Sequence, residues 1–260
     1  MTDIGINGAA GRMGRLLVAE ACEDERFRIV AAREHPGSEF IGEDCGEVAG
    51  IGEIGVAIAG GLTGAEVVID FSTAEGAMDA LEYCLEAEAA LVTGTTALEE
   101  EHYDRLYSAG KQIGVLAASN FSLGVAALRE VAAELAGRFP DADIEIIEAH
   151  HNRKADSPSG TALSIADSIS EVRMLEPVFG RRGRVGPRDN TELGIHSVRA
   201  GGIIGEHRII FGMPHETIIL KHRAVSRKLF AWGALEAGAA ISGKTGYFEI
   251  QDLFKKNTGE

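Results

Sequence analysis

The chain has 260 residues, of which 45% are hydrophobic and 25% charged, the balance of a folded globular protein rather than a disordered or collagen-like one. Its formal net charge of −15 argues against nucleic-acid binding, which needs a surplus of basic side chains on the binding surface. No apolar run is long enough to span a membrane and the start lacks a signal-peptide pattern, so we expect a cytoplasmic protein with no membrane partner.

The first half alternates between strand and helix patterns. A strand over residues 3–7 leads through a glycine turn into a helix from about Gly11, and a second strand covers residues 27–32. Apolar strands at 67–71, 90–93 and 113–117 follow with helical patterns between them, the first helix opened by a capping box from Ser72 to Glu75. Such alternation builds a parallel sheet.

The second half has a different character. A helix after Asn120 places Leu128, Val131, Leu135 and Phe139 on one face, and a strand follows over residues 143–151. Strand patterns at 193–199, 203–211 and 216–223 predict antiparallel hairpins or a mixed sheet. A helical tail over residues 229–243 can pack on either part. We therefore predict an α/β fold with a second, mixed-sheet α+β domain.

A glycine-rich turn stands where dinucleotide-binding proteins hold a pyrophosphate. It lies between the first strand and the first helix, and Glu34 follows Gly14 by 20 residues, as expected of the carboxylate that accepts from a ribose hydroxyl. The spacing is G-x-x-G-x-x-G, and the turn alone also fits an ordinary α/β turn or an S-adenosylmethionine site. With Glu34 it favours a nicotinamide cofactor, whose candidate ligands here are Gly8, Ala9, Ala10, Gly11, Arg12, Met13 and Glu34.

Further candidate cofactor ligands lie at the ends of two later strands, where open α/β sheets bind ligands. They are Gly94, Thr95, Thr96, Ala118, Ser119, Asn120 and Phe121. Taken singly, either segment also fits a plain turn in which Thr or Ser caps a helix.

The densest group of polar residues runs from Glu148 to Thr161, between a strand and a helix. His150 and Lys154 can donate or accept protons, while Gly160 and Thr161 present backbone N–H groups that suit a carboxylate. Neighbouring residues of a strand point to opposite faces, and the three cysteines form no C-x-x-C pair, so we expect no metal site. A lone surface His or Lys has no role in most proteins, but the cluster favours function. Residues 150–228 carry 13 basic and 8 acidic side chains, which suits an anionic ligand; the acidic remainder aids solubility or suits a salty cytoplasm.

These residues resemble the dihydrodipicolinate reductase (4-hydroxy-tetrahydrodipicolinate reductase) family over essentially the whole chain. Glu148 to Ala162 is similar to the family's E-A-H-H-x-x-K-x-D-x-P-S-G-T-A motif, and Gly8 to Gly14 is similar to its G-x-x-G-R-M-G turn. The segments at 94–96, 120–122, 205–207 and 222–227 fit as well. Ser157, Ala74 and Gly202 depart from the family pattern, outside the proposed proton-transfer residues.

The resemblance implies a dinucleotide-binding domain with a Rossmann-type parallel sheet over residues 1–121 with 229–260. It also implies a substrate-binding and oligomerisation domain over 122–228 that builds a homotetramer. The implied reaction is hydride transfer from NADH or NADPH to a cyclic imine dicarboxylate in the diaminopimelate route to lysine. By the same resemblance, His150 and Lys154 form the acid/base pair, and His151, Gly160 and Thr161 hold substrate carboxylates.

Two alternatives remain from the residues alone. One is another nicotinamide reductase of small anionic substrates; a semialdehyde dehydrogenase would need a cysteine nucleophile, and none lies near a plausible site. The other is a catalytically silent, dinucleotide-sensing regulator, against which the intact His150 and Lys154 pair argues. For the cofactor, Glu34 favours NADH by repelling the 2′-phosphate of NADPH, unless Arg33 or His35 compensates.

Overall fold

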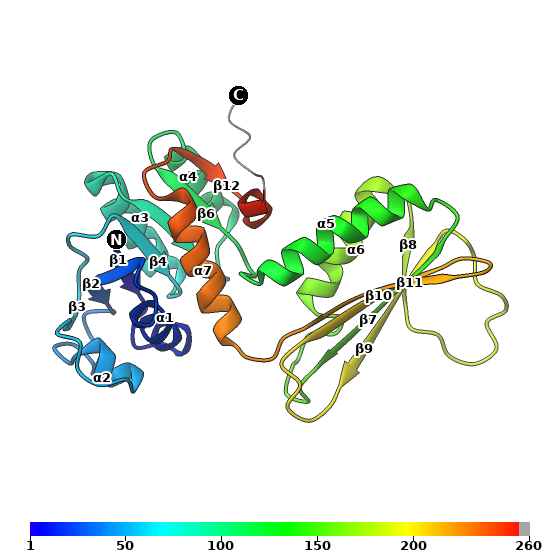
Figure 1. Ribbon diagram of the computed structural model, residues 1–260, viewed down its shortest axis with the longest axis horizontal. Coiled ribbons are helices and arrows are strands. Elements are labelled where there is room, and N and C mark those ends of the chain that lie inside the picture. The colour runs from blue at the N-terminus through cyan, green and yellow to red at the C-terminus, as the bar shows by residue number, and fades with distance from the viewer. Residues whose placement is uncertain (255–260) are drawn as a thin grey trace. The chain divides into compact units, whose positions relative to one another are not determined.

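The computed structural model describes residues 1–254 and divides into two compact units (Figure 1). Unit 1 comprises Met1–Phe121 together with the segment from Lys228 onward, and unit 2 comprises Ser122–Arg227. No helix within residues 1–254 is long and apolar enough to cross a bilayer. Each unit has its own sheet and is described separately.

Unit 1 is built on a parallel sheet with the strand order β12-β6-β5-β4-β1-β2-β3 within the described chain. All of its strand pairs are parallel, and the central strands are buried runs of Val, Ile and Leu, as expected of a sheet covered on both faces. The predicted Rossmann-type sheet is therefore confirmed. The strands are β1 (Thr2–Asn7), β2 (Phe27–Arg33), β3 (Ile58–Ala59), β4 (Val67–Asp70), β5 (Ala90–Thr93), β6 (Gly114–Ala117) and β12 (Gly246–Phe248).

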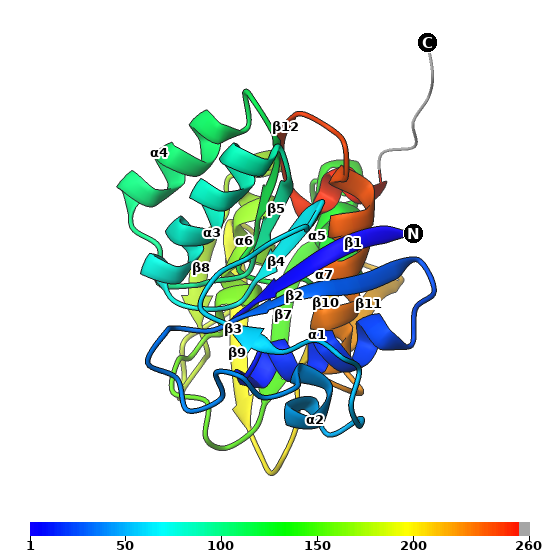
Figure 2. The same cartoon turned by 90° about the vertical axis from the view of Figure 1, so that its left-hand side faces the viewer.

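Helices cover both faces of this sheet (Figure 2). Helices α3 (Ala74–Ala87) and α4 (Glu100–Ala109) lie on one face, and α1 (Arg12–Cys22) and α7 (Lys228–Ile241) lie on the other. The short helices α2 (Cys45–Ala49) and η1 (Ile250–Phe254) complete the unit. Helix α7 packs on β4, β5 and β6, so the tail that the sequence left open belongs to unit 1.

The predicted capping box at Ser72 is wrong by one residue. Thr73 is the N-cap of α3, and its side chain accepts from Gly76 N at 3.1 Å. The Ser72 hydroxyl instead donates to the buried carboxylate of Asp70. The demand of a buried charge for hydrogen bonds outweighs the local capping preference.

Unit 2 has a mixed sheet with the strand order β11-β10-β7-β9-β8 within the described chain. Strands β7, β9 and β8 are parallel neighbours, whereas β10 is antiparallel to both β7 and β11, which confirms the mixed sheet. Helices α5 (Leu123–Arg138) and α6 (Gly160–Val172) pack on one face (Figure 1). The strands are β7 (Asp143–His150), β8 (Glu176–Phe179), β9 (Glu192–Arg199), β10 (Glu206–Gly212) and β11 (Thr217–Arg223).

The apolar face predicted for α5 is correct only in part. Leu128 is buried in the core of unit 2, but Val131 is 41% exposed. Ala132 and Ala136 are fully buried instead, and small residues at these positions allow the close packing of α5 against α6. The hydrophobic pattern therefore located the helix but not its full contact face.

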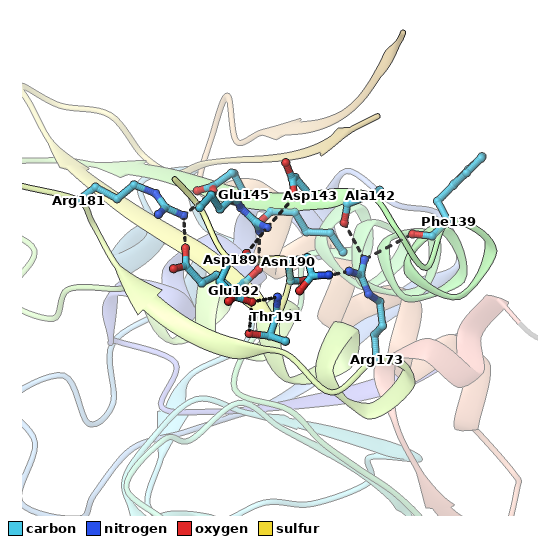
Figure 3. Close-up of polar contacts among 12 residues, drawn as sticks. Phe139, Ala142, Asp143, Glu145, Arg173, Arg181, Asp189, Asn190, Thr191 and Glu192 are labelled. Atoms are coloured by element: carbon cyan, nitrogen blue, oxygen red, sulfur yellow. Dashed lines mark hydrogen bonds and ion pairs between the residues drawn. The ribbon is translucent and has the colours of Figure 1, made fainter. Parts of the chain in front are cut away.

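A polar network ties the segment between β8 and β9 to the neighbouring strands (Figure 3). Arg181 pairs with Glu192 at 2.5 Å and Glu145 at 3.2 Å. Arg173 donates to the carbonyl oxygens of Ala142 and Phe139. Arg188 adds ion pairs to Asp143 and Glu145 at 2.7 and 3.1 Å. These three arginines are held by other residues of unit 2. Only part of the excess of basic side chains in residues 150–228 can therefore bind an anionic ligand.

Candidate functional site

The glycine turn of unit 1 requires glycine at two positions. Gly8 has a φ of +79°, and a Cβ there would lie 2.6 Å from the carbonyl oxygen of Phe71. A Cβ at Gly14 would lie 2.1 Å from the oxygen of Gly8, so the first turn of α1 can pack on the loop only without a side chain. No side chain of these two glycines therefore covers the backbone at the start of α1, where N–H groups and the helix dipole favour binding of a phosphate. This cradle fits the pyrophosphate of a dinucleotide.

The residues after β2 have definite partners. Glu34 Oε1 accepts from Ala10 N in the glycine turn at 2.8 Å, which places the carboxylate beside the proposed cofactor site. Arg33 is buried and points into the unit: it donates to Asn7 Oδ1 at 2.8 Å and pairs with Asp79 at 2.5 Å. His35 is exposed, and its Nδ1 accepts from the backbone of Gly37.

A cavity of about 390 Å³ opens beside this turn in unit 1. It brings together eight of the residues predicted for the cofactor: Arg12, Met13, Gly94, Thr95, Thr96, Ser119, Asn120 and Phe121. Phe71, Ser72 and Phe230 also line it and were missed. The Phe71 ring packs against Gly94, where a Cβ would lie 2.2 Å from it. The remaining predicted ligands, Gly8 to Gly11, Glu34 and Ala118, do not line this cavity within residues 1–254.

The buried carboxylate of Asp70 holds these loops in place by hydrogen bonds. Asp70, at the end of β4, accepts from Asn7 Nδ2 at 2.7 Å, Thr93 Oγ1 at 2.6 Å and Thr95 Oγ1 at 2.8 Å. Burial raises the pKa of Asp70, although these hydrogen bonds oppose the shift. Because Thr95 also accepts from Ser72 N at 3.0 Å, Asp70 connects two loops that line the cavity.

The polar residues of unit 2 gather at one end of the helix-covered face of its sheet. Residues two apart on a strand share a face, so Glu148 and His150 continue the row that Ile144 and Ile146 begin in the apolar core. The neighbouring strands complete the group. His207 of β10 pairs with Glu148, His222 of β11 pairs with His207, and Arg199 of β9 pairs with His150.

Glu148 is the most connected side chain of this group. It is fully buried and accepts from the two Nη atoms of Arg199 at 2.7 and 2.8 Å and from Ser159 N at 3.1 Å. His150 Nδ1 lies 2.6 Å from its other carboxylate oxygen. Burial alone would raise the pKa of Glu148, but the hydrogen bonds from Arg199 and His150 outweigh it and lower the pKa to about 2. The carboxylate is therefore ionised at any working pH.

Two further histidines form a row with His150. The rings of His150 and His207 meet edge to face at 5.3 Å, and His222 lies 6.3 Å beyond His207. Burial, together with repulsion from His150 and His222, lowers the pKa of His207 to about 4. Burial also lowers the pKa of His222. Both rings are thus neutral near pH 7.

The loop after β7 holds the other predicted residues. Lys154 Nζ lies 2.8 Å from Asp156, and burial, then repulsion from Arg227 and Arg153, lowers the pKa of His151. Gly160 is the first residue of α6: its N–H donates to Asp156, and a Cβ there would meet no described atom within 4 Å, so there is free space on that side of the residue. No cluster of His, Cys, Asp or Glu suited to a metal occurs among residues 1–254.

The sequence alone predicted no role for Glu148, Arg199 or His207, although Glu148 and His207 stand in segments that resemble those of the family. Glu148 carried a usable signal, since it stands two residues before His150 on one strand and must share its face. Arg199 and His207 lie 49 and 57 residues after His150 along the chain. Only strand pairing brings them to it.

Comparisons with known proteins match both halves of the chain to one family. The model for the N-terminus of dihydrodipicolinate reductase matches residues 2–121, and that for its C-terminus matches residues 124–254. The 4-hydroxy-tetrahydrodipicolinate reductase of Alkalilimnicola ehrlichii is 42% identical over 97% of this chain and 98% of its own length. That of Acinetobacter baumannii is 41% identical over 98% and 96%.

A solved structure agrees as well. The dipicolinate-bound dihydrodipicolinate reductase from Paenisporosarcina sp. TG-14 has a TM-score of 0.79 and 26% identity, and the match covers 96% of this chain and 97% of that one. With the glycine turn, the cavity beside it and the histidine group described, these matches show that the chain belongs to the dihydrodipicolinate reductase family.

Proposed function

We propose that the chain reduces 4-hydroxy-tetrahydrodipicolinate to tetrahydrodipicolinate with a nicotinamide cofactor, in the diaminopimelate route to lysine. Family membership supports this, and the observation that carries it is the segment from His150 to Thr161. There the imidazole of His150, at the end of β7, and the ammonium group of Lys154, in the loop that follows, precede the start of α6. A proton donor beside a carboxylate cradle is what reduction of an anionic imine requires.

Different residues serve proton transfer, carboxylate binding and cofactor binding. The bound cofactor supplies the hydride, and the net reaction adds one hydride and one proton while the 4-hydroxyl leaves as water. His150 Nε2 and Lys154 Nζ are the groups that hold and move the proton. The N–H groups of Gly160 and Thr161 and the side chain of His151 bind the carboxylates, and the residues of the glycine turn and the unit 1 cavity bind the cofactor.

A coupled assay tests this function. Freshly generated product of dihydrodipicolinate synthase is mixed with the chain and NADH, and nicotinamide absorbance is followed. We expect substrate-dependent oxidation of NADH. A chain that binds NADH without oxidising it would be the silent regulator, and turnover only with other small anionic substrates would indicate a different reductase.

Pyridine-2,6-dicarboxylate is expected to inhibit competitively against the substrate, because it presents two carboxylates on one flat ring. The relative from Paenisporosarcina holds dipicolinate. Inhibition should weaken as ionic strength rises, since screening reduces the attraction between the dianion and the basic residues. Pyridine-2-carboxylate is the control and should bind at least tenfold more weakly. Equal inhibition by both compounds would contradict two anchored carboxylates.

The cofactor is expected to be NADH rather than NADPH. Glu34 lies beside the glycine turn and repels a 2′-phosphate, while Arg33 is tied to Asn7 and Asp79 and cannot neutralise it without breaking those contacts. We expect kcat/KM to favour NADH by roughly tenfold, about 1.4 kcal/mol, and Glu34→Ala to remove most of this preference. The control is Glu66→Ala, since Glu66 precedes β4 at the amino-terminal end of the parallel strands, whereas Glu34 follows β2 at their carboxyl-terminal end. An unchanged preference in Glu34→Ala would refute this assignment.

The assembly is expected to be a cytoplasmic homotetramer formed through the sheet of unit 2. The face of that sheet not covered by α5 and α6 leaves Val198 of β9 and Ile219 of β11 43% and 47% exposed, and a second copy of the sheet packed on this face would cover both side chains. Light scattering should give the mass of four chains, and Ile219→Glu should lower it. Ile51→Glu, at an exposed position of unit 1, is the control. A monomeric wild type would contradict this assembly.

A further inference from the structure

The carboxylate of Glu148 contacts both halves of the proposed substrate site. One oxygen lies 2.6 Å from His150 Nδ1, and the other accepts from Ser159 N, next to the first residue of α6. Arg199 donates to both oxygens at 2.7 and 2.8 Å. A single fully buried side chain thus joins the imidazole to the helix start.

These contacts decide which nitrogen of His150 carries the permanent proton. An ionised carboxylate only accepts hydrogen bonds, so His150 Nδ1 must be the donor at 2.6 Å. The other nitrogen, Nε2, is then the one that exchanges protons. It lies beside Gly205, where a Cβ would come within 3.1 Å of it, so a side chain at this position would crowd Nε2 and glycine does not.

The same carboxylate fixes the start of α6. Ser159 is the N-cap of this helix: its Oγ accepts from Ala162 N at 3.2 Å, and its own N–H is held by Glu148. The following residues, Gly160 and Thr161, are those proposed to bind a substrate carboxylate. A shift of Glu148 would therefore move the proton donor and the carboxylate cradle together.

We propose that Glu148 is a positioning residue that keeps the Nδ1 of His150 protonated, leaves Nε2 for proton transfer and holds the start of α6 in register with it. The kinetic part of this inference rests on the proposed function; the tautomer of His150 does not. Arg199 completes the arrangement by occupying the remaining acceptor positions of the carboxylate.

The tautomer is tested in the wild-type chain by ¹⁵N NMR of the histidine rings, with His150→Gln used to assign the signals. We expect neutral His150 to carry its proton on Nδ1. Protonation on Nε2 would overturn the proposal, and this measurement needs neither substrate nor a variant of Glu148.

Glu148→Gln then tests the coupling. The amide replaces one acceptor oxygen with a donor, so it cannot accept from Arg199 at both positions. We expect His150 to show a mixture of tautomers, kcat to fall roughly 10- to 100-fold as part of the contribution of acid–base catalysis, and KM for the substrate to rise severalfold. KM for NADH should stay within twofold, which separates this effect from general damage.

The matched control is Glu145→Gln on the same strand. Glu145 also bonds a histidine, His196, at 2.7 Å and an arginine, Arg188, at 3.1 Å. This variant should change the signals of His196 but leave those of His150 and kcat unaltered. An inactive wild type would refute the proposed function only, whereas an active Glu148→Gln with wild-type kcat would refute the positioning role only. If Glu148→Gln does not fold, the wild-type tautomer still decides.

Discussion

Lys154→Ala or His150→Gln is expected to lower kcat by roughly 10² to 10⁴, the usual contribution of general acid–base catalysis. His150 is buried beside an ionised carboxylate, and Lys154 lies in the loop that leads to α6. Both residues belong to unit 2, whereas the glycine turn and the cavity proposed for the cofactor belong to unit 1, so KM for NADH should hardly change. Steady-state kinetics at saturating NADH, with the substrate generated in situ, measures both quantities.

His215→Gln and Lys111→Ala are the matched controls, because both side chains are exposed and His215 lies in the turn at the far end of the β10–β11 hairpin. They should retain wild-type kcat. If both site variants also kept wild-type kcat at saturating substrate, the assigned roles would be wrong. If only one lost activity, that residue alone would move the proton.

His207 is expected to make unit 2 less stable as the pH falls from about 6.5 to 4. An unfolded histidine has a pKa near 6.5, whereas burial and the neighbouring histidines lower the pKa of His207 to about 4 in the folded chain. Within this window the unfolded state binds the extra proton. The contribution of His207 is therefore complete above pH 6.5 and lost towards pH 4, a difference of about 3 kcal/mol.

Hydrogen exchange of the β10 amides, corrected for its intrinsic pH dependence, measures this change. It reports on unit 2 itself, whereas the single tryptophan, Trp232, lies in unit 1. His207→Gln should flatten the dependence between pH 4 and 6.5 by about 3 kcal/mol, whatever its stability at pH 7. The remaining loss comes from other groups, Glu148 among them, and His215→Gln should follow the wild type. Equal slopes in wild type and His207→Gln would contradict the burial argument.

The parallel sheet of unit 1 was predictable because buried parallel strands are continuous apolar runs, as in β4 and β5. The short strands β3, β8 and β12 were missed. Strands β3 and β12 have two and three residues, too few for a pattern, and β8 contains Glu176 and Pro177 in place of the continuous apolar run of β4 and β5. The tail helix carried a clear apolar pattern but no information about its partner; its burial against β4, β5 and β6 placed it in unit 1.

For the site, the sequence by itself determined which functional groups lie close to one another along the chain. His150, Lys154, Gly160 and Thr161 fall within 12 residues, and a strand followed by a helix brings them to one loop in any fold of this class. The glycine turn and Glu34 belong to one strand–helix–strand unit and were found for the same reason.

Only the tertiary structure decided how these residues are held. Arg199 and His207 reach Glu148 and His150 through the pairing of β7 with β9 and β10. Asp70 accepts hydrogen bonds from β1, from β5 and from the loop that follows β5. A buried charge needs several hydrogen bonds at once, and no single segment of chain can supply them all. The chemical groups of the site could therefore be named from the sequence, whereas their supports depend on which strands the fold makes neighbours.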